Sequence, residues 1–159
     1  MPEIRYYEAV SQALAEEMTR DPRVFVLGED VGLVGGTFRA TEGLMAEFGA
    51  RRVRDTPIAE AGIIGVAMGA AMTGLRPVAE LMTLNFGIVA MDQIINHVSK
   101  ARYMFGGQAH LLADQMRVAL VLRMHRDGGV AEQGFRARGG DGEEAGAVLQ
   151  RIVDFPDEA

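Results

Sequence analysis

Residues 59–81 read AEAGIIGVAMGAAMTGLRPVAEL, and this stretch decides the fold. Residues 61–75 are rich in Gly and Ala and carry no charged side chain, which indicates a buried helix. They fall short of the roughly 20 residues that a helix needs to cross a bilayer. Gly74 and Pro77 end the helix, and residues 78–81 then form a candidate parallel strand. A helix followed at once by a buried strand is half of an α/β repeat.

The same alternation continues on both sides of this stretch. Residues 24–27, Val-Phe-Val-Leu, have the pattern of a strand that is covered on both faces of a parallel sheet. Apolar residues recur at helical spacing over residues 6–18 and 86–104. The other predicted elements are a helix over residues 41–48 with Thr41 as its cap and Gly49 as its stop, strands over residues 52–55 and 118–122, and a helix over residues 143–155 with Val148, Leu149, Ile152 and Val153 on one side. This order predicts an α/β fold, namely a doubly wound, mostly parallel sheet with helices on both faces.

The composition of the 159 residues excludes several classes of protein. The chain has no Cys, which removes disulfide frameworks, Cys-based zinc sites and thiol nucleophiles. Its formal net charge of −6 gives no general attraction for nucleic acid. Residues 1–5 resemble neither a secretory signal nor an organelle transit peptide, so we expect a cytoplasmic protein without a membrane segment. No Gly-x-Gly-x-x-Gly joins a strand to a helix, which argues against a dinucleotide-binding module.

The glycines of the helix in the opening stretch have two interpretations. Gly62, Gly65 and Gly69 leave little side-chain bulk on part of its surface. A glycine inside a helix costs about 0.5–1 kcal/mol relative to Ala, so close packing is expected in return. The helix either packs closely on its own sheet or lies against a cofactor or another chain.

Glu60 is the residue of this stretch that is best suited to chemistry. It follows Asp55-Thr56-Pro57-Ile58-Ala59 and stands at the start of the glycine-rich helix, before a run of apolar residues. A carboxyl group in such surroundings can share a proton with a bound heterocycle. A Glu in a first helical turn is also favoured by the helix dipole without any function. Spacing alone leaves both interpretations open.

Longer segments point to a known family. They are Val26-Leu27-Gly28-Glu29-Asp30-Val31, Gly35-Gly36, Asp55-Thr56-Pro57-Ile58 with Glu60, Gly69-Ala70-Ala71-Met72, Gly74-Leu75-Arg76-Pro77, Asn85-Phe86, Met91-Asp92-Gln93-Ile94 and Tyr103-Met104-Phe105-Gly106-Gly107-Gln108. Through them the chain, from Arg5 to about Gln108, resembles the beta subunit of the first component of 2-oxo acid dehydrogenase complexes, which depends on thiamine diphosphate. The pyruvate dehydrogenase type is the most similar.

The resemblance implies a transketolase-like pyrimidine-binding domain and gives three residues a role. Glu60 would hydrogen-bond the ring nitrogen N1′ of the cofactor's aminopyrimidine and so activate the cofactor. Phe86 would pack on the pyrimidine ring, although a core Phe is the alternative. Glu29 matches a family acid near the cofactor, but an acid that merely ends a strand would look the same.

The resemblance also implies partners. In the family, an alpha subunit holds the diphosphate and its magnesium in a heterotetramer-like assembly, so we expect no metal site in this chain. A lipoyl acyltransferase core and a 2-oxo acid substrate are implied as well. Gly140-Asp141-Gly142 matches the opening of the family's diphosphate motif, but the Asn that this motif needs further along is missing, so we interpret the triplet as a loop.

The second part of the sequence departs from the family. Residues 109–117 look like an insertion, and none of His97, His110 or His125 stands in the family's Gln-His-Ser setting. We therefore divide the chain into a pyrimidine-binding domain, residues 1–126, and a divergent tail, residues 127–159, without the family's C-terminal domain.

Two classes of function stay open for such a chain. It is either a dehydrogenase subunit that works with an alpha subunit, or a truncated relative that serves as an inactive interaction module. The sequence does not fix the 2-oxo acid: pyruvate comes first, with branched-chain 2-oxo acids and acetoin as alternatives. We expect the isolated chain to be inactive.

Overall fold

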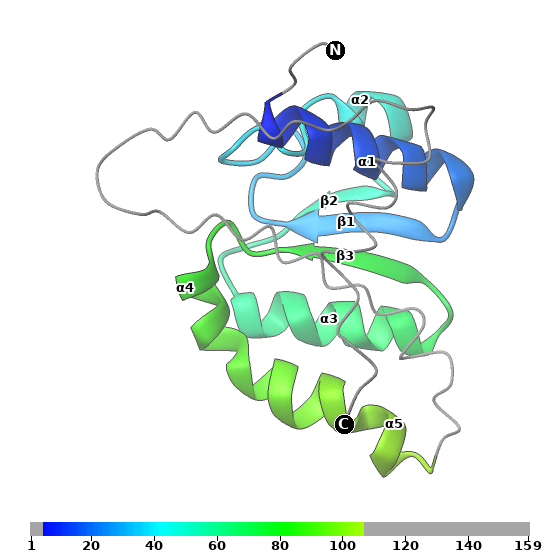
Figure 1. Ribbon diagram of the computed structural model, residues 1–159, viewed down its shortest axis with the longest axis vertical. Helices are drawn as coiled ribbons and strands as arrows, with labels where there is room; N and C mark the ends of the chain where they lie inside the picture. Colours follow the sequence, from blue (N-terminus) through cyan, green and yellow to red (C-terminus); the bar gives the residue numbers. More distant parts are fainter. Residues whose placement is uncertain (1–4, 107–159) are drawn as a thin grey trace.

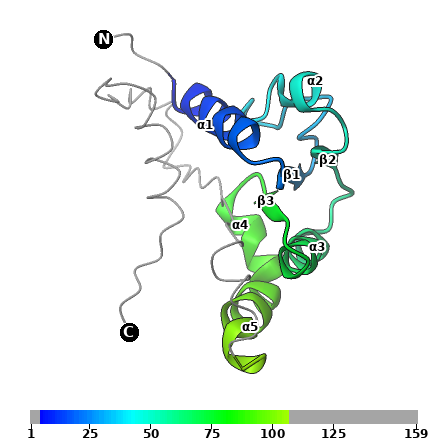
Figure 2. The same cartoon turned by 90° about the vertical axis from the view of Figure 1, so that its right-hand side faces the viewer.

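The computed structural model describes residues 5–106 and shows a parallel sheet between two layers of helices (Figure 1). α1 (Tyr6–Arg20) and α2 (Leu44–Phe48) lie on one side of the sheet, and α3 (Glu60–Met72) lies on the other (Figures 1 and 2). The predicted doubly wound α/β fold is confirmed. The predicted strand over residues 118–122, the helix over residues 143–155, the Gly140-Asp141-Gly142 triplet, His110 and His125 lie outside the described residues.

β1 (Val24–Gly28) is the central strand. β2 (Val53–Asp55) and β3 (Arg76–Glu80) run parallel to it on either side, in the order β2-β1-β3. In this register Val26 pairs with Val53 on one side and with Val78 on the other. The central position explains why β1 is apolar throughout, since helices cover both of its faces.

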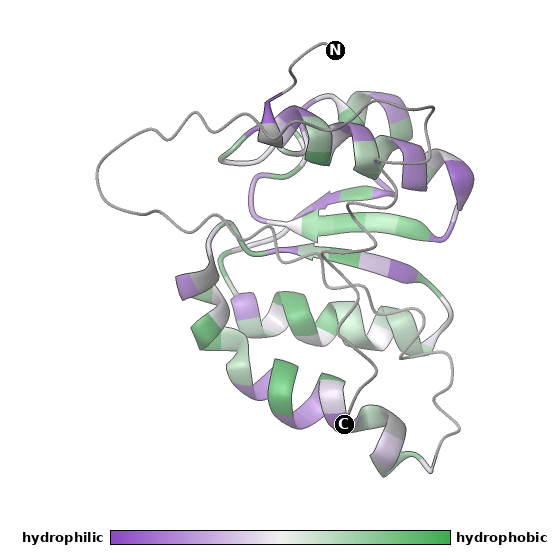
Figure 3. Cartoon of the chain, in the orientation of Figure 1, coloured by the Kyte–Doolittle hydropathy of each residue, from purple (hydrophilic) through white to green (hydrophobic). Residues whose placement is uncertain are grey.

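Alternate residues of the strands pack into two clusters, one on each face of the sheet. The cluster beneath α1 contains Val10, Leu14, Met18, Val26 and Val53, and the cluster beneath α3 contains Leu27, Ile63, Ile64, Ala67 and Ala79. Colouring by hydropathy shows β1 as a nearly continuous apolar ribbon between them (Figure 3). These clusters hold the strand ends, and therefore the candidate site, in place.

The predicted cap of α2 is wrong. α2 begins at Leu44, and its N-cap is Gly43 in the left-handed conformation rather than Thr41. Thr41 is buried in the preceding loop, where its backbone N–H donates to the carbonyl of Gly35 and its hydroxyl has no hydrogen-bond partner. Thr41 therefore contacts α2 through its carbonyl, which accepts from the Leu44 N–H at 3.2 Å, and not through a capping side chain, whereas the predicted stop at Gly49 is confirmed.

The predicted helix over residues 86–104 consists of several segments. α4 (Leu84–Gly87) is followed by the 3₁₀ turn η1 (Ile88–Ala90), the π-helix η2 (Gln93–Val98) and α5 (Ser99–Met104). The hydroxyl of Ser99, the first residue of α5, donates to the carbonyl of Ile95 in η2, at 2.5 Å. Such side-chain hydrogen bonds compete with the regular backbone hydrogen bonds of an α-helix. The spacing of apolar residues does not reveal this competition.

Candidate functional site

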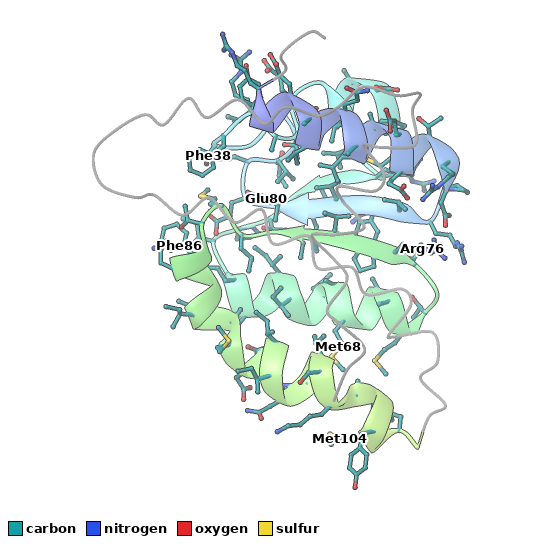
Figure 4. The ribbon with its side chains drawn as sticks, viewed as in Figure 1. Phe38, Met68, Arg76, Glu80, Phe86 and Met104 are labelled. Carbon is teal, nitrogen blue, oxygen red and sulfur yellow. The ribbon has the colours of Figure 1, made fainter. Side chains whose placement is uncertain are left out.

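Three carboxylates lie at the carboxyl end of the sheet. Glu29 directly follows β1, Glu80 is the last residue of β3, and Glu60 is the first residue of α3, just after β2. The carboxyl ends of parallel strands share one edge, which is where ligands bind in open α/β sheets. In Figure 4 the labelled Glu80 and Phe86 lie toward this end of the sheet.

The structure brings Glu29 and Glu60 into electrostatic contact. Burial raises the pKa of Glu29, and the neighbouring charges of Glu60 and Asp30 raise it further. Glu60 makes no side-chain hydrogen bond within the described residues, and the N-cap of α3 is Ala59, which has no capping group. Glu60 is therefore free to bond a ligand. The repulsion between the two carboxylates favours a proton held at this place.

Glu80 is a site residue that the sequence analysis missed. It is 5% exposed, and burial raises its pKa to about 7, an effect that the charge of Glu29 strengthens and a hydrogen bond from the Met82 N–H opposes. That bond is 2.9 Å long and ends on Oε1, whereas the buried Oε2 has no partner. The sequence does contain a signal for Glu80, because it is the single acid in the otherwise apolar strand predicted over residues 78–81.

The backbones of Gly28 and Glu80 lie very close to each other. A Cβ added to Gly28 would lie 2.6 Å from the Glu80 carbonyl oxygen, so only glycine fits at the end of β1. Just after β3, Met82 has a φ of 56°, and the Thr83 N–H donates to the Leu81 carbonyl across it at 2.5 Å. A non-glycine residue with positive φ stores strain, which structures keep mainly at functional sites.

Phe86 lies on α4 and is 39% exposed. Its side chain is therefore not buried within the described part of the chain. A partly exposed aromatic ring can pack against a planar ligand ring.

Asp55 and Thr56 fix the start of α3 relative to β1. The Asp55 carboxylate accepts a hydrogen bond from the Gly32 N–H at 2.6 Å, and the Thr56 N–H donates to the Gly28 carbonyl at 2.9 Å. These bonds connect the end of β2 to the loop that follows β1. These two hydrogen bonds therefore fix the position of Glu60 relative to Glu29.

The glycines of α3 do not pack on their own sheet. A Cβ added to Gly65 or Gly69 would meet nothing within 4 Å, and one added to Gly62 would touch only Ala59, at 3.5 Å. The helix instead faces the sheet with its larger side chains, Ile63 and Ile64 among them. Close packing of the glycines on the sheet is therefore wrong for this helix.

No group of three or more His, Cys, Asp or Glu side chains is placed to hold a metal ion anywhere in residues 5–106. Among the same residues, no helix is both long and apolar enough to span a membrane.

A parallel α/β sheet with carboxylates and a partly exposed aromatic ring at its carboxyl end has the architecture of the open α/β domains in which ligands bind at that edge. The family model described as the pyrimidine-binding domain of transketolase matches residues 2–135, and the chain belongs to this family. The division of the chain at residue 126 stays a prediction.

The chain is similar to beta subunits of 2-oxo acid dehydrogenases. It is 57% identical over 101 residues to the pyruvate dehydrogenase E1 component subunit beta of Rhizobium meliloti, covering 64% of this chain and 22% of that protein. The corresponding subunit of Rickettsia bellii is 51% identical over 106 residues, 67% of this chain and 33% of that protein. The 2-oxoisovalerate dehydrogenase subunit beta of Bacillus subtilis is 53% identical over 103 residues, 65% of this chain and 32% of that protein. The resemblance seen in the sequence is confirmed, and the chain spans between about a fifth and a third of the length of these relatives.

The raised pKa of Glu80 predicts a specific pH dependence of stability. Because the folded state holds this proton more tightly than the unfolded chain does, the stabilisation is complete below about pH 4.5 and is lost as the pH rises through about 7. The full difference is at most about 3 kcal/mol. We expect the free energy of unfolding of Glu80→Gln, measured by urea denaturation, to change less between pH 5 and about 8 than that of the parent chain. The exposed Glu47 provides the control variant Glu47→Gln, and an unchanged slope in Glu80→Gln would contradict the assignment.

Proposed function

We propose that the chain is the pyrimidine-binding part of the beta subunit of a 2-oxo acid dehydrogenase and acts in oxidative decarboxylation together with an alpha subunit. The observation that carries the proposal is the position of Glu60, at the start of α3, beside Glu29 and with no side-chain hydrogen bond to any other residue in 5–106. The names of the similar beta subunits support the reaction class.

The residues present fit the pyrimidine half of thiamine diphosphate. When bound, the cofactor supplies the nucleophilic carbon that attacks the keto group of a 2-oxo acid. Glu60 would hydrogen-bond the pyrimidine nitrogen N1′, and Phe86 would pack on the ring and orient it. Glu29 lies close enough to Glu60 for their charges to interact, and this interaction contributes to the raised pKa of Glu29.

The diphosphate and its magnesium are proposed to sit on the alpha subunit. In support, the described carboxylates form no cluster that could hold a metal ion. We further propose that the acyl group passes to the lipoyl group of an acyltransferase core, as the reaction class requires. An inactive interaction module remains the second candidate, and cofactor titration of the assembled subunits separates the two.

Pyruvate is the proposed substrate. Several similar beta subunits are named for pyruvate dehydrogenase, although the subunit named for 2-oxoisovalerate dehydrogenase is nearly as similar. Turnover of pyruvate, 2-oxoisovalerate and acetoin by the assembled enzyme tests this choice. A higher kcat/KM for either of the other two compounds would contradict it.

The exposed glycines of α3 are proposed to face the alpha subunit. We expect Gly65→Leu to leave the stability of this chain unchanged or slightly higher, by up to about 1 kcal/mol, because its side chain meets open space and Leu favours a helix. Association with the alpha subunit should weaken at least about 10-fold, because the added side chain prevents close approach. Ala46→Leu, an exposed substitution on α2, is the control. Equal affinity of the two variants, measured by calorimetry, would contradict the contact.

A further inference from the structure

A pocket of about 660 Å³ runs along the outer side of β2, and its lining includes none of Glu29, Glu60, Glu80 and Phe86. Its apolar lining comes from Phe25 and Leu27 of β1, Val66 of α3 and Leu75 after α3. Val66 is 61% exposed and Leu75 is 42% exposed, which is unusual for large apolar side chains that line one depression. None of the α3 glycines lines it, so this pocket is distinct from the glycine surface proposed to face the alpha subunit.

The edge of the pocket is basic. Arg51 and Arg54 line it, and neither makes an ion pair within the described part of the chain. Two other lining arginines are already occupied, because Arg23 is paired with Asp21 and Arg52 donates to the carbonyls of Val24 and Met18. The lining carboxylate of Asp55 accepts from the Gly32 N–H. The Arg54 Nε donates to the Arg51 carbonyl, at 3.2 Å, but no acidic side chain of the described residues pairs with Arg51 or Arg54, so both charges can meet an acidic ligand.

The sequence contains a segment of matching chemistry. Residues 143–155 place Val148, Leu149, Ile152 and Val153 on one side of a predicted helix, and the same residues carry three acidic side chains and one basic side chain. A 13-residue helix would be about 20 Å long, so it can cover β2, whose three residues span about 10 Å, together with the chain on either side of it. The segment thus matches the pocket in length, apolar content and charge.

We propose that residues 143–155 of this same chain dock as an amphipathic helix into the pocket along β2. Aliphatic side chains fill the apolar lining, and acidic side chains meet Arg51 and Arg54, in the helix-in-groove mode of recognition. The chain between Gly106 and Glu143 can span at most about 120 Å, so its length permits this contact. Covalent linkage supplies an effective concentration in the millimolar range, which favours the segment over a separate partner.

Disulfide trapping in the full 159-residue chain tests the proposal, because the chain has no Cys of its own. We expect the variant Val66→Cys with Leu149→Cys to form an intramolecular disulfide at least about 10-fold faster than Ile88→Cys with Leu149→Cys. The control position is matched, since Ile88 is 66% exposed against 61% for Val66, and both substitutions remove an exposed side chain. Equal rates would overturn the proposal. Disulfide-linked dimers as the main product would overturn it as well, because they would assign the pocket to a second copy.

A charge reversal distinguishes disulfide formation through specific docking from disulfide formation through random collision of the two cysteines. Adding Arg54→Glu to the 66/149 pair should slow its oxidation toward the rate of the control pair, because the reversed charge repels the acidic segment. Lys100→Glu, an exposed reversal on α5, should leave the rate unchanged. Equal slowing by both reversals would overturn the role of Arg54. Neither readout depends on cofactor or turnover, so these results are independent of the proposed dehydrogenase function.

Discussion

Glu60→Gln in the assembled alpha–beta enzyme is expected to lower the rate of 2-oxo acid decarboxylation by at least about 100-fold, the effect of losing a positioned acid–base group. Gln keeps the shape of Glu60 but cannot hold or share the proton at the pyrimidine nitrogen. The fold should be unaffected, because Glu60 makes no side-chain hydrogen bond with the described residues and does not cap α3.

The measurement is steady-state decarboxylation with saturating cofactor, with the melting temperature of each variant measured alongside. Glu47→Gln changes an exposed carboxylate on α2 and should retain full activity. If Glu60→Gln turned over at the parent rate in an intact assembly, Glu60 would have no part in the reaction. The helix dipole would then be the reason for an acid at this position.

The isolated 159-residue chain is expected to bind thiamine diphosphate weakly and to turn over no 2-oxo acid. A cofactor held through its pyrimidine alone lacks the charged contacts that fix its reactive part, and misplaced reactants lose most of their rate. The described residues offer no cluster of metal ligands for the magnesium that accompanies the diphosphate.

Calorimetry with magnesium and cofactor gives the affinity of the isolated chain, and pyruvate decarboxylation with an artificial electron acceptor gives its turnover. A dissociation constant below about 1 μM, which corresponds to about 8 kcal/mol of binding free energy, would contradict the divided site. Measurable turnover would contradict it too.

The regular part of the fold could be predicted because its residues repeat with clear periods. The apolar run of β1, the helical spacing in α1 and the uncharged, Gly- and Ala-rich run of α3 reflect burial, which the sequence records directly. The start of α2 could not be predicted in this way, since its N-cap is Gly43 in the left-handed conformation and not a side chain with a capping group. The π-helix η2 was missed because its residues keep an ordinary helical spacing of apolar side chains.

The candidate site was predictable only in part. Glu60, Glu29 and Phe86 were found through resemblance to a family, and the structure places Glu29 and Glu60 in electrostatic contact. Glu80 was missed because a single acid in an apolar strand does not show whether it is buried. Its burial depends on the close approach of Gly28, which only the three-dimensional arrangement reveals.

The central claim is that this chain completes a thiamine diphosphate site by supplying its pyrimidine half. The most direct test is a calorimetric titration of the cofactor, with magnesium, into the alpha subunit alone and into the alpha subunit mixed with this chain or its Glu60→Gln variant. We predict at least about 10-fold tighter binding with the parent chain than with the alpha subunit alone, and a loss of most of that gain with Glu60→Gln. Identical affinity in all three titrations, with association of the subunits verified, would contradict the account.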